Sequence, residues 1–317
     1  MQHRIVFLDR SSLGAELRRP RFEHDWAEYA STAGAEETAA RLRDATIAIT
    51  NKVPLRSETL ASAPGLKLVA MAATGYDVVD IAYCRDHGIA VSNIRNYATN
   101  TVPEHVFALV LALRRNLLAY RRDVENGRWQ SIDQFCFFDH PIGDLAGATM
   151  GIIGEGSLGQ ATASIARAFG MRVLFADHPP PKAPGVEFTP LERVLAESDV
   201  ISLHMPLTAD TRNLIGAAQL RTMKPTALLI NTARGGLVDE AALASALREG
   251  VIGGAGFDVL TREPPVDGNP LLELRLPNFI LTPHIAWASQ GAMQFLADQL
   301  IDNVEAFVAG VPSNLVV

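Results

Sequence analysis

The sequence predicts an α/β protein built from two domains, each with a parallel sheet. Short apolar runs alternate with helical stretches along almost the whole chain of 317 residues, which is the rhythm of strand–helix–strand units. A Gly-rich turn at residues 154–159 lies between one such run and an amphipathic helix. The length exceeds what one hydrophobic core usually organises, so we expect two domains with a ligand-binding cleft between them.

In the first part of the chain, apolar runs predict four strands, at residues 4–8, 46–50, 66–71 and 89–92. The segment Thr101-Val-Pro-Glu104 has the spacing of a capping box with Thr101 as N-cap, and the apolar positions that follow predict one long helix to Tyr120. The aromatic segment 121–145 lacks the periodicity of a strand or a helix, so we expect an arm laid over another surface.

From Ala148 onward the alternation becomes regular. It predicts six strands, at residues 149–153, 172–176, 200–204, 226–231, 253–258 and 279–282. Strands joined by helical crossovers make a doubly wound parallel sheet. Three prolines, Pro179–Pro181, predict a stiff surface turn. A helical pattern from His284 to about Ala309 is expected to return to the N-terminal domain.

The composition favours a globular protein that acts on small molecules. Hydrophobic residues make up 48% and charged residues 20% of the chain, and the net charge is −7 with no basic run, so neither nucleic acid nor an anionic membrane is an expected partner. No apolar stretch approaches the roughly 20 residues of a membrane span, and the N-terminal apolar run is too short for a signal peptide. Cys84 and Cys136 lie far apart in the sequence, which argues against a disulfide framework or a metal site. We expect a cytoplasmic protein without a metal.

The Gly-rich turn has the pattern that binds the pyrophosphate of a dinucleotide. It comprises Gly154, Glu155, Gly156, Ser157, Leu158 and Gly159. The three glycines permit a tight turn, close approach of the backbone to a pyrophosphate and close helix–strand packing, and the N-terminus of the following helix attracts the anion. The Glu155 side chain is expected to point away from the phosphates.

Asp177 ends the next predicted strand, where a carboxylate accepts hydrogen bonds from the adenosine ribose hydroxyls. Because an acid at this position repels a 2′-phosphate, NAD is favoured over NADP. A plain Gly-rich turn and a surface aspartate remain the alternatives.

Three charged or titratable residues follow predicted strands in the second half of the chain: Arg234, Glu263 and His284. In a parallel sheet all three lie beyond the carboxyl edge, where open α/β folds bind ligands. Reduction of a 2-oxo acid by hydride needs a proton donor for the carbonyl oxygen and a cation for the carboxylate. A carboxylate beside His284 would keep a proton on the imidazole near neutral pH, and Arg234 can hold a carboxylate through two parallel hydrogen bonds. Taken singly, each residue is more often structural or solvated.

The segments that carry these residues resemble a known family. INTARGGLVDEAAL, GFDVLTREPP and LTPHIAWAS, with GEGSLG and ATGYDVVD upstream, are similar to the D-isomer-specific 2-hydroxyacid dehydrogenases, and among them to the glycerate dehydrogenases, or hydroxypyruvate reductases. The resemblance spans nearly the whole chain and implies NAD-dependent reduction of hydroxypyruvate or glyoxylate to D-glycerate or glycolate. It also implies that Arg234 binds and polarises the substrate, that His284 is the acid/base and that Glu263 tunes the histidine.

The resemblance implies an architecture as well. A Rossmann-type cofactor domain, residues 99–286, would accompany a flavodoxin-like substrate domain made from residues 1–98 and 287–317. The aromatic arm resembles the family's dimer arm, which implies a homodimer through the cofactor domain; an intramolecular lid is the alternative. Asn96 stands where relatives often have a glycine in the hinge region.

Further site positions are carried over from the resemblance. The positions implied to border the substrate are Asn51, Lys52, Thr74 and Gly75. The positions implied to line the cofactor are His204, Pro206, Thr232, Ala233, Asp258 and His284, with Asp258 near the nicotinamide amide.

Two other functions remain open on the sequence alone. Another enzyme of the same family, acting on a bulkier 2-oxo acid, phosphoglycerate or phosphite, would share these motifs, although no cluster of Arg and Lys marks a phosphate pocket. An interaction protein that senses NAD(H) could keep the glycines of the fold and lose turnover.

Overall fold

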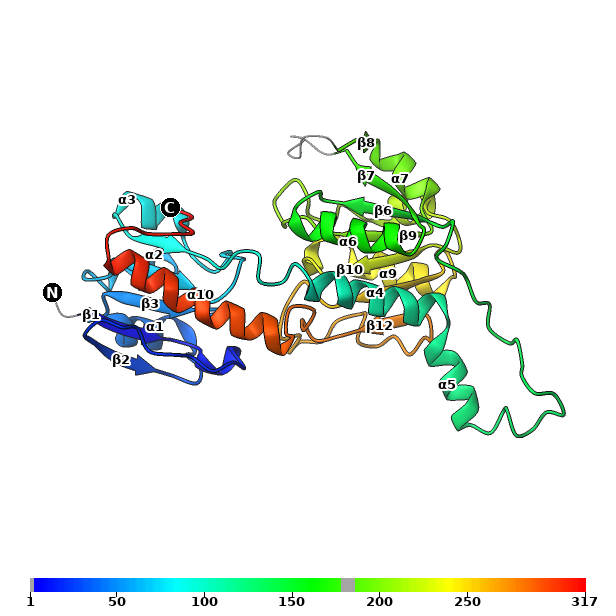
Figure 1. Ribbon diagram of the computed structural model, residues 1–317, viewed down its shortest axis with the longest axis horizontal. Helices are drawn as coiled ribbons and strands as arrows, with labels where there is room; N and C mark the ends of the chain where they lie inside the picture. Colours follow the sequence, from blue (N-terminus) through cyan, green and yellow to red (C-terminus); the bar gives the residue numbers. More distant parts are fainter. Residues whose placement is uncertain (1–2, 178–185) are drawn as a thin grey trace. The chain divides into compact units, whose positions relative to one another are not determined.

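The computed structural model describes residues 3–177 and 186–317 (Figure 1). The chain divides into two compact units: unit 1 combines Met1–Tyr97 with Ala288–Val317, and unit 2 is the continuous segment Ala98–Trp287. The turn predicted at Pro179–Pro181 lies outside the described residues. Among the described residues, no helix is long and apolar enough to cross a membrane.

Unit 1 is built on a sheet of five parallel strands. The strands are β1 (His3–Phe7), β2 (His24–Glu28), β3 (Ile47–Thr50), β4 (Leu68–Met71) and β5 (Ala90–Ser92). Their order is β2-β1-β3-β4-β5, which is the flavodoxin-like order. All residues of β3 and β4 are buried, as expected for the central strands of a parallel sheet covered on both faces.

Helices cover both faces of this sheet. Those of unit 1 are η1 (Arg10–Ser12), α1 (Gly34–Leu42), α2 (Ser57–Ala61), α3 (Ile81–Asp86) and α10 (Gln290–Val308). One core joins Leu42, Leu60 and Cys84 of α1, α2 and α3 to alternate strand residues such as Val69. The long helix α10, labelled in Figure 1, packs against β4 and buries its own apolar stripe, which includes Leu300. The C-terminal helix therefore belongs to the N-terminal unit.

Unit 2 contains a sheet of seven parallel strands. They are β6 (Thr149–Ile153), β7 (Arg172–Ala176), β8 (Phe188–Thr189), β9 (Val200–Leu203), β10 (Leu228–Asn231), β11 (Gly254–Phe257) and β12 (Phe279–Leu281). Their order is β12-β11-β10-β9-β6-β7-β8. This is a doubly wound sheet whose order reverses at β6, and such a reversal opens a crevice at the carboxyl edge. The prediction of six strands missed β8.

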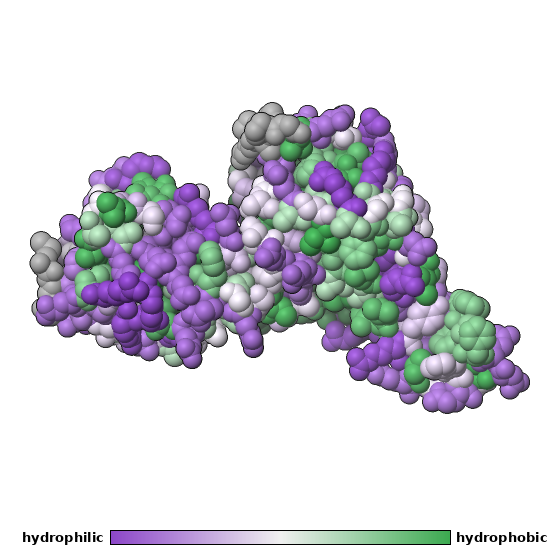
Figure 2. Space-filling view, in the orientation of Figure 1, coloured by the Kyte–Doolittle hydropathy of each residue, from purple (hydrophilic) through white to green (hydrophobic). Residues whose placement is uncertain are grey.

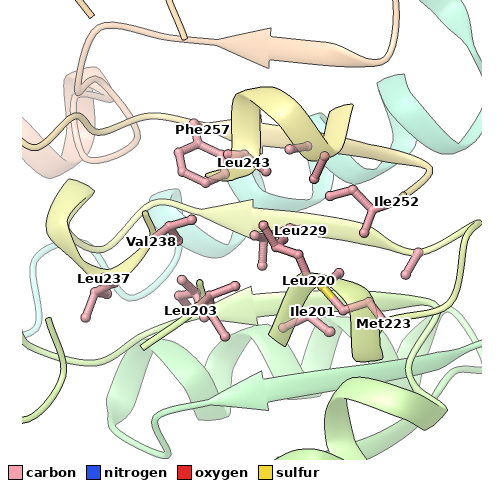
Figure 3. Close-up of a cluster of buried hydrophobic side chains, with 14 of the residues drawn as sticks. Ile201, Leu203, Leu220, Met223, Leu229, Leu237, Val238, Leu243, Ile252 and Phe257 are labelled. Carbon is pink, nitrogen blue, oxygen red and sulfur yellow. The ribbon is translucent and has the colours of Figure 1, made fainter. Parts of the chain in front are cut away.

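Two helical layers enclose the sheet of unit 2. The helices are α4 (Thr101–Arg114), α5 (Leu117–Glu125), α6 (Ser157–Ala168), α7 (Leu191–Glu197), α8 (Ala217–Thr222), α9 (Glu240–Arg248) and the turn η2 (Gly235–Leu237). On one face, Ile230 packs with apolar residues of α4 and α6. On the other face, Leu229 packs with Leu220 of α8 and Leu243 of α9 (Figure 3). Successive residues of one strand thus enter opposite cores, as side-chain alternation requires.

The helix predicted from Thr101 to Tyr120 is two helices, so that prediction is wrong. Asn116 adopts φ +50° between α4 and α5, a left-handed conformation that asparagine tolerates better than most residues. The predicted capping box is also wrong. Thr101 is the first helical residue and Asn100 is the N-cap, with no side-chain cap. Pro103 is tolerated in this first turn because its missing N–H would have no partner within the helix.

The segment after α5 contains no regular strand or helix up to β6. It is stabilised by contacts within itself and with α5: Tyr120 donates its hydroxyl to the carbonyl of His140 at 2.7 Å, and the Trp129 indole N–H donates to the carbonyl of Phe135 at 2.9 Å. The Phe135 and Phe138 side chains are 87% and 83% exposed. We call α5 with residues 126–145 the arm.

Candidate active site

The carboxyl edge of the unit 2 sheet brings together the three residues predicted for the reacting centre. Arg234 follows β10, Glu263 follows β11 and His284 follows β12. These strands are adjacent and parallel, so their following loops converge on one edge. The structure describes no cluster of three or more side chains able to hold a metal ion within residues 3–177 and 186–317.

His284 and Glu263 form a close pair. Nδ1 of the imidazole lies 2.5 Å from Oε2 of the carboxylate. The other carboxylate oxygen accepts the backbone N–H of Leu260 at 2.8 Å, so the carboxylate is fixed on both sides. A carboxylate at Nδ1 selects the tautomer that carries its proton there, and it stabilises the imidazolium form. Nε2 is then the nitrogen able to exchange a proton with a substrate.

The backbone of His284 is held in an uncommon conformation. Its φ is +56°, a left-handed value that costs energy for a residue with a Cβ. Its N–H donates to the carbonyl of Asp258 at 2.7 Å, and its carbonyl accepts the indole N–H of Trp287 at 2.9 Å. Both backbone groups are therefore anchored, which orients the imidazole before any ligand binds.

The Asp258 side chain also holds the segment around His284 in place. It is buried, and its oxygens accept the N–H groups of Ile285 and Ala286 at 2.9 and 2.7 Å and the Thr282 hydroxyl at 2.5 Å. His105 on α4 completes this group, with Nε2 3.0 Å from the Thr282 hydroxyl oxygen. The chain around His284 is thus fixed by a buried carboxylate as well as by its own backbone bonds.

The loop that presents Arg234 is positioned by Asn231 at the end of β10. The Asn231 amide donates to the carbonyl of Arg234 at 2.9 Å and accepts the N–H of Ala233 at 3.1 Å. Gly235 then passes so close to the next loop that a Cβ would lie 1.9 Å from the carbonyl carbon of Leu260. Only glycine permits this approach, which sets the Arg234 loop directly against the loop that leads to Glu263.

A cavity of about 390 Å³ borders the His284–Glu263 pair. Most of its lining is apolar, and the lining residues are Asp258, Leu260, Glu263, Pro264, Pro265, Leu272, Leu281, Thr282, Pro283 and His284. Low polarity around an ion pair strengthens the interaction between the charges. The cavity therefore places apolar side chains beside the pair, which stays partly exposed to solvent.

The Gly-rich turn after β6 has the geometry of an anion cradle. Gly154 adopts φ +106°, and a Cβ there would lie 2.6 Å from the carbonyl oxygen of His204. A Cβ on Gly159 would lie 2.0 Å from the carbonyl oxygen of Gly154. Around Gly156, by contrast, no atom lies within 4 Å of the Cβ position. The first and third glycines are required by the chain itself, and the second leaves open space of the kind that a pyrophosphate occupies.

The helix that follows this turn is suited to an anion. Gly156 is the N-cap of α6, and the first turn of the helix has no acidic residue, so its N–H groups can bind a phosphate without competing charge. Glu155 is buried, with 4% exposure, while Ser157 is exposed. Asp177 directly follows β7 and is exposed. The residues present therefore fit a dinucleotide.

The remaining positions that are predicted to line a cofactor lie on loops at this same carboxyl edge. His204 and Pro206 follow β9, while Thr232 and Ala233 follow β10. Burial lowers the pKa of His204 to about 4, so its imidazole, which lies 2.8 Å from the Ser202 hydroxyl, is neutral at pH 7. The hydroxyl of Thr232 is buried and has no hydrogen-bond partner among the described residues, as expected of a polar group that a ligand completes.

In unit 1, the predicted substrate positions lie at the carboxyl edge of that sheet. Asn51 and Lys52 follow β3, and Thr74 and Gly75 follow the adjacent strand β4. Asn51 is buried and Lys52 is exposed. The Thr74 hydroxyl donates to the carbonyl of Ile94 at 2.6 Å, which ties this loop to the segment after β5.

Three residues that hold the candidate site in place were not predicted from the sequence. Thr282, Trp287 and Asn231 form hydrogen bonds with Asp258, His284 and Arg234, respectively, but no sequence motif marks them. Gly235 had a visible signal, because it is one of two consecutive glycines directly after the candidate Arg234. A glycine pair at a strand end indicates close approach of backbones.

Comparison with known proteins agrees with this geometry. Residues 107–286 match the family model of the D-isomer specific 2-hydroxyacid dehydrogenase NAD binding domain. The chain is 58% identical to a glycerate dehydrogenase of Methylorubrum extorquens, over 100% of this chain and 99% of that protein.

Two solved structures extend the likeness to the fold. A D-lactate dehydrogenase of Aquifex aeolicus, complexed with NAD and lactic acid, superposes with a TM-score of 0.82 and 30% identity over 97% of this chain and 96% of that one. An NADPH-dependent glyoxylate/hydroxypyruvate reductase of Sinorhizobium meliloti superposes with a TM-score of 0.83 and 30% identity over 99% and 98%. The protein is therefore an oxidoreductase that belongs to the D-isomer-specific 2-hydroxyacid dehydrogenase family.

Proposed function

We propose that this enzyme uses NAD(H) to interconvert hydroxypyruvate or glyoxylate with D-glycerate or glycolate. The observation that carries the proposal is the 2.5 Å pair of His284 and Glu263 beside the Arg234 loop. The likeness to a glycerate dehydrogenase, at 58% identity over the whole chain, favours these small acids over a bulkier 2-oxo acid.

The proposed roles follow from the chemistry of reduction. Nicotinamide, when bound, supplies the hydride that adds to the carbonyl carbon. His284 donates a proton from Nε2 to the carbonyl oxygen, and Glu263 stabilises the imidazolium that holds this proton. Arg234 binds the carboxylate of the substrate and draws electron density from the adjacent carbonyl. In the reverse direction, neutral His284 accepts the proton of the hydroxyl.

The substrate and cofactor sites follow the two units. We propose residues 1–98 with 287–317 as the substrate domain, in which Asn51, Lys52, Thr74 and Gly75 border the 2-oxo acid. Residues 99–286 form the proposed cofactor domain. There the 154–159 turn binds the pyrophosphate, and the positions lining the rest of the cofactor are Asp177, His204, Pro206, Thr232, Ala233 and Asp258.

NAD is proposed over NADP because of Asp177. Its carboxylate is exposed at the end of β7, where it can accept hydrogen bonds from the ribose hydroxyls and where it repels a 2′-phosphate. The Sinorhizobium meliloti relative is NADPH-dependent, and the Aquifex aeolicus relative is complexed with NAD. Since the family uses both cofactors, we propose that Asp177 determines the cofactor preference of this enzyme.

The assay that tests these proposals follows the absorbance of NADH and of NADPH on addition of hydroxypyruvate, glyoxylate, pyruvate or a branched 2-oxo acid. We expect rapid NADH oxidation with the first two acids, and kcat/KM at least about tenfold lower with NADPH because of the charge of Asp177. The variant Asp177→Ser should narrow the difference between the cofactors. Binding of NADH without oxidation across the whole panel would contradict the proposed activity and favour a sensor.

We also propose a homodimer formed through the arm. The exposed large apolar residues of this one segment include Leu117, Leu118, Trp129, Phe135 and Phe138. Figure 2 shows green, hydrophobic patches among purple, hydrophilic ones at its lower right. Apolar surface concentrated on a projecting segment is typical of a protein–protein interface. A second copy of the chain is the occupant that the family resemblance implies.

Sedimentation at micromolar concentration tests the dimer. The double variant Phe135→Ser/Phe138→Ser is expected to sediment as a monomer where the wild type sediments as a dimer, because it removes two exposed aromatic side chains from the arm. Val311→Ser is the matched control, since Val311 is 70% exposed but lies in unit 1. A monomeric wild type would overturn the proposal.

The cytoplasm is the proposed compartment. Cys84 and Cys136 are both free thiols, and Cys84 is buried, which fits a reducing environment. Cell fractionation tests this assignment.

A further inference from the structure

Outside the centre described above, unit 1 contains a buried carboxylate that contacts a proposed substrate loop. Asp9 comes two residues after β1 and is 6% exposed. Its Oδ1 and Oδ2 accept the N–H of Asn51 at 3.0 and 3.1 Å, and Oδ2 accepts the N–H of Lys52 at 2.6 Å. One side chain thus binds the two consecutive backbone N–H groups directly after β3.

Burying a carboxylate is unfavourable unless hydrogen bonds compensate for its lost hydration. Burial raises the pKa of Asp9, and the hydrogen bonds from the Lys52 and Asn51 backbone offset only part of this rise. A carboxylate accepting backbone N–H groups is a strong, charge-assisted interaction, and an unpaired buried N–H is unfavourable. Asp9 therefore holds the backbone N–H groups of both Asn51 and Lys52.

A second contact fixes the other side of the same loop. The Val53 N–H donates to the Thr50 hydroxyl at 3.0 Å, so residues 51 and 52 lie between two side-chain anchors. Asn51 is itself buried while Lys52 is exposed. With the backbone of both residues fixed, the Lys52 side chain extends from a loop of defined conformation rather than from a flexible turn.

We propose that Asp9 is a positioning residue for substrate binding, which acts by preorganising the Asn51–Lys52 loop. This inference rests on the proposed function, in which the two residues border the 2-oxo acid. A loop that is already ordered does not lose conformational freedom when substrate binds, so its order lowers the KM of the substrate. Asp9 itself, buried behind the loop, does not touch the substrate.

The variant Asp9→Asn tests the proposal because it keeps the size of the side chain and changes its hydrogen bonding. An amide has one acceptor oxygen and brings an NH₂ donor against backbone donors. We expect KM for hydroxypyruvate to rise about 10- to 100-fold, the effect of leaving one buried N–H unpaired. We expect kcat and the Kd of NADH to change by less than about threefold, because the hydride and proton transfer groups are in unit 2.

Thr46→Val is the matched control. The Thr46 hydroxyl oxygen accepts the N–H of Arg4 at 3.0 Å. Thr46 thus links the N-terminal ends of the paired strands β1 and β3, whereas Asp9 links the segments that follow their C-terminal ends. Both variants should lower the Tm, and only Asp9→Asn should raise KM. Hydrogen exchange of a peptide covering residues 50–55 gives a readout without catalysis, and it should be faster in Asp9→Asn alone.

The outcomes distinguish a failure of the positioning role of Asp9 from a failure of the proposed function. An active wild type together with an unchanged KM in Asp9→Asn overturns the positioning role alone, and so does an equal rise of KM in Thr46→Val. A wild type inactive on every 2-oxo acid overturns the proposed function and this inference with it. If Asp9→Asn does not fold, Asp9→Glu takes its place. This variant retains the charge and displaces it by one methylene, so its KM should be higher than that of the wild type. An unchanged KM in Asp9→Glu would equally contradict the role.

Discussion

Replacing His284 by asparagine is expected to lower kcat about 10²- to 10⁴-fold, the usual contribution of a positioned general acid. Asparagine is the suitable replacement because it tolerates the left-handed conformation of His284, φ +56°, so the backbone of the loop is retained while the titratable group is lost. Steady-state kinetics with hydroxypyruvate gives kcat, and quenching of protein fluorescence gives the Kd of NADH, which should stay within about threefold of the wild type.

Two further variants make this result specific. Glu263→Gln keeps a hydrogen-bond acceptor near Nδ1 of His284 but removes the negative charge, so kcat should fall, though less than in His284→Asn. His87→Asn removes an exposed histidine of α3's C-cap and should leave turnover unchanged. A His284→Asn enzyme that retains most of its kcat would exclude His284 as the proton donor.

Replacing Arg234 by lysine is expected to lower kcat/KM for hydroxypyruvate about 10- to 150-fold. A lysine keeps the positive charge, but it cannot form two parallel hydrogen bonds to a carboxylate, and each charge-assisted bond is worth about 1.5–3 kcal/mol. The loss should appear in both KM and kcat, because the guanidinium both binds the carboxylate and polarises the carbonyl. Initial rates over a range of substrate concentration separate the two parameters.

The comparison for this variant is Arg248→Lys, an exposed arginine at the end of α9, which should behave as the wild type. Arg234→Lys with a wild-type kcat/KM would show that a point charge suffices. The bidentate contact proposed here would then be wrong, while the His284 result would be unaffected.

Patterns of hydrophobicity predicted the central strands because these are buried on both faces. The strands β3, β4, β9 and β10 consist wholly of buried residues, and continuous apolar runs of this kind are typical of parallel sheets. Two edge strands escaped the prediction. β2 has no buried residue in HDWAE, and β8 contains only Phe188 and Thr189, so neither shows an apolar run to detect.

Local signals were less informative where tertiary contacts decide the conformation. The spacing of Thr101 and Glu104 fits a capping box, yet the helix begins at Thr101 itself. The apolar positions between Val102 and Leu117 fit one helix, yet Asn116 interrupts it. Both errors concern ends of helices, where one backbone torsion changes the outcome and hydrophobic periodicity carries no information.

For the candidate site, the fact that Arg234, Glu263 and His284 each follow a predicted strand was sufficient to predict that they lie at one edge of the sheet. The sequence could not show which atoms meet, because the 2.5 Å contact of Nδ1 with the carboxylate depends on a left-handed residue and on a loop approach allowed by Gly235. Supporting residues such as Asn231 and Asp9 act through backbone N–H and carbonyl groups, which every residue has. Their partners are visible only once the chain is folded.

The division of unit 1 between two distant segments has a consequence for folding during synthesis. Leu300 and Val304 of α10 are buried, and Val91 of β5 exchanges backbone hydrogen bonds with Val316 and Val317. The helix α10 and the two C-terminal valines, however, leave the ribosome after the whole of unit 2. Unit 2 is continuous and can fold as soon as it emerges, since domains generally fold as units. Until α10 emerges, the nascent chain exposes one apolar face of the first sheet. Exposed apolar surface of this kind makes an incompletely folded chain prone to aggregation.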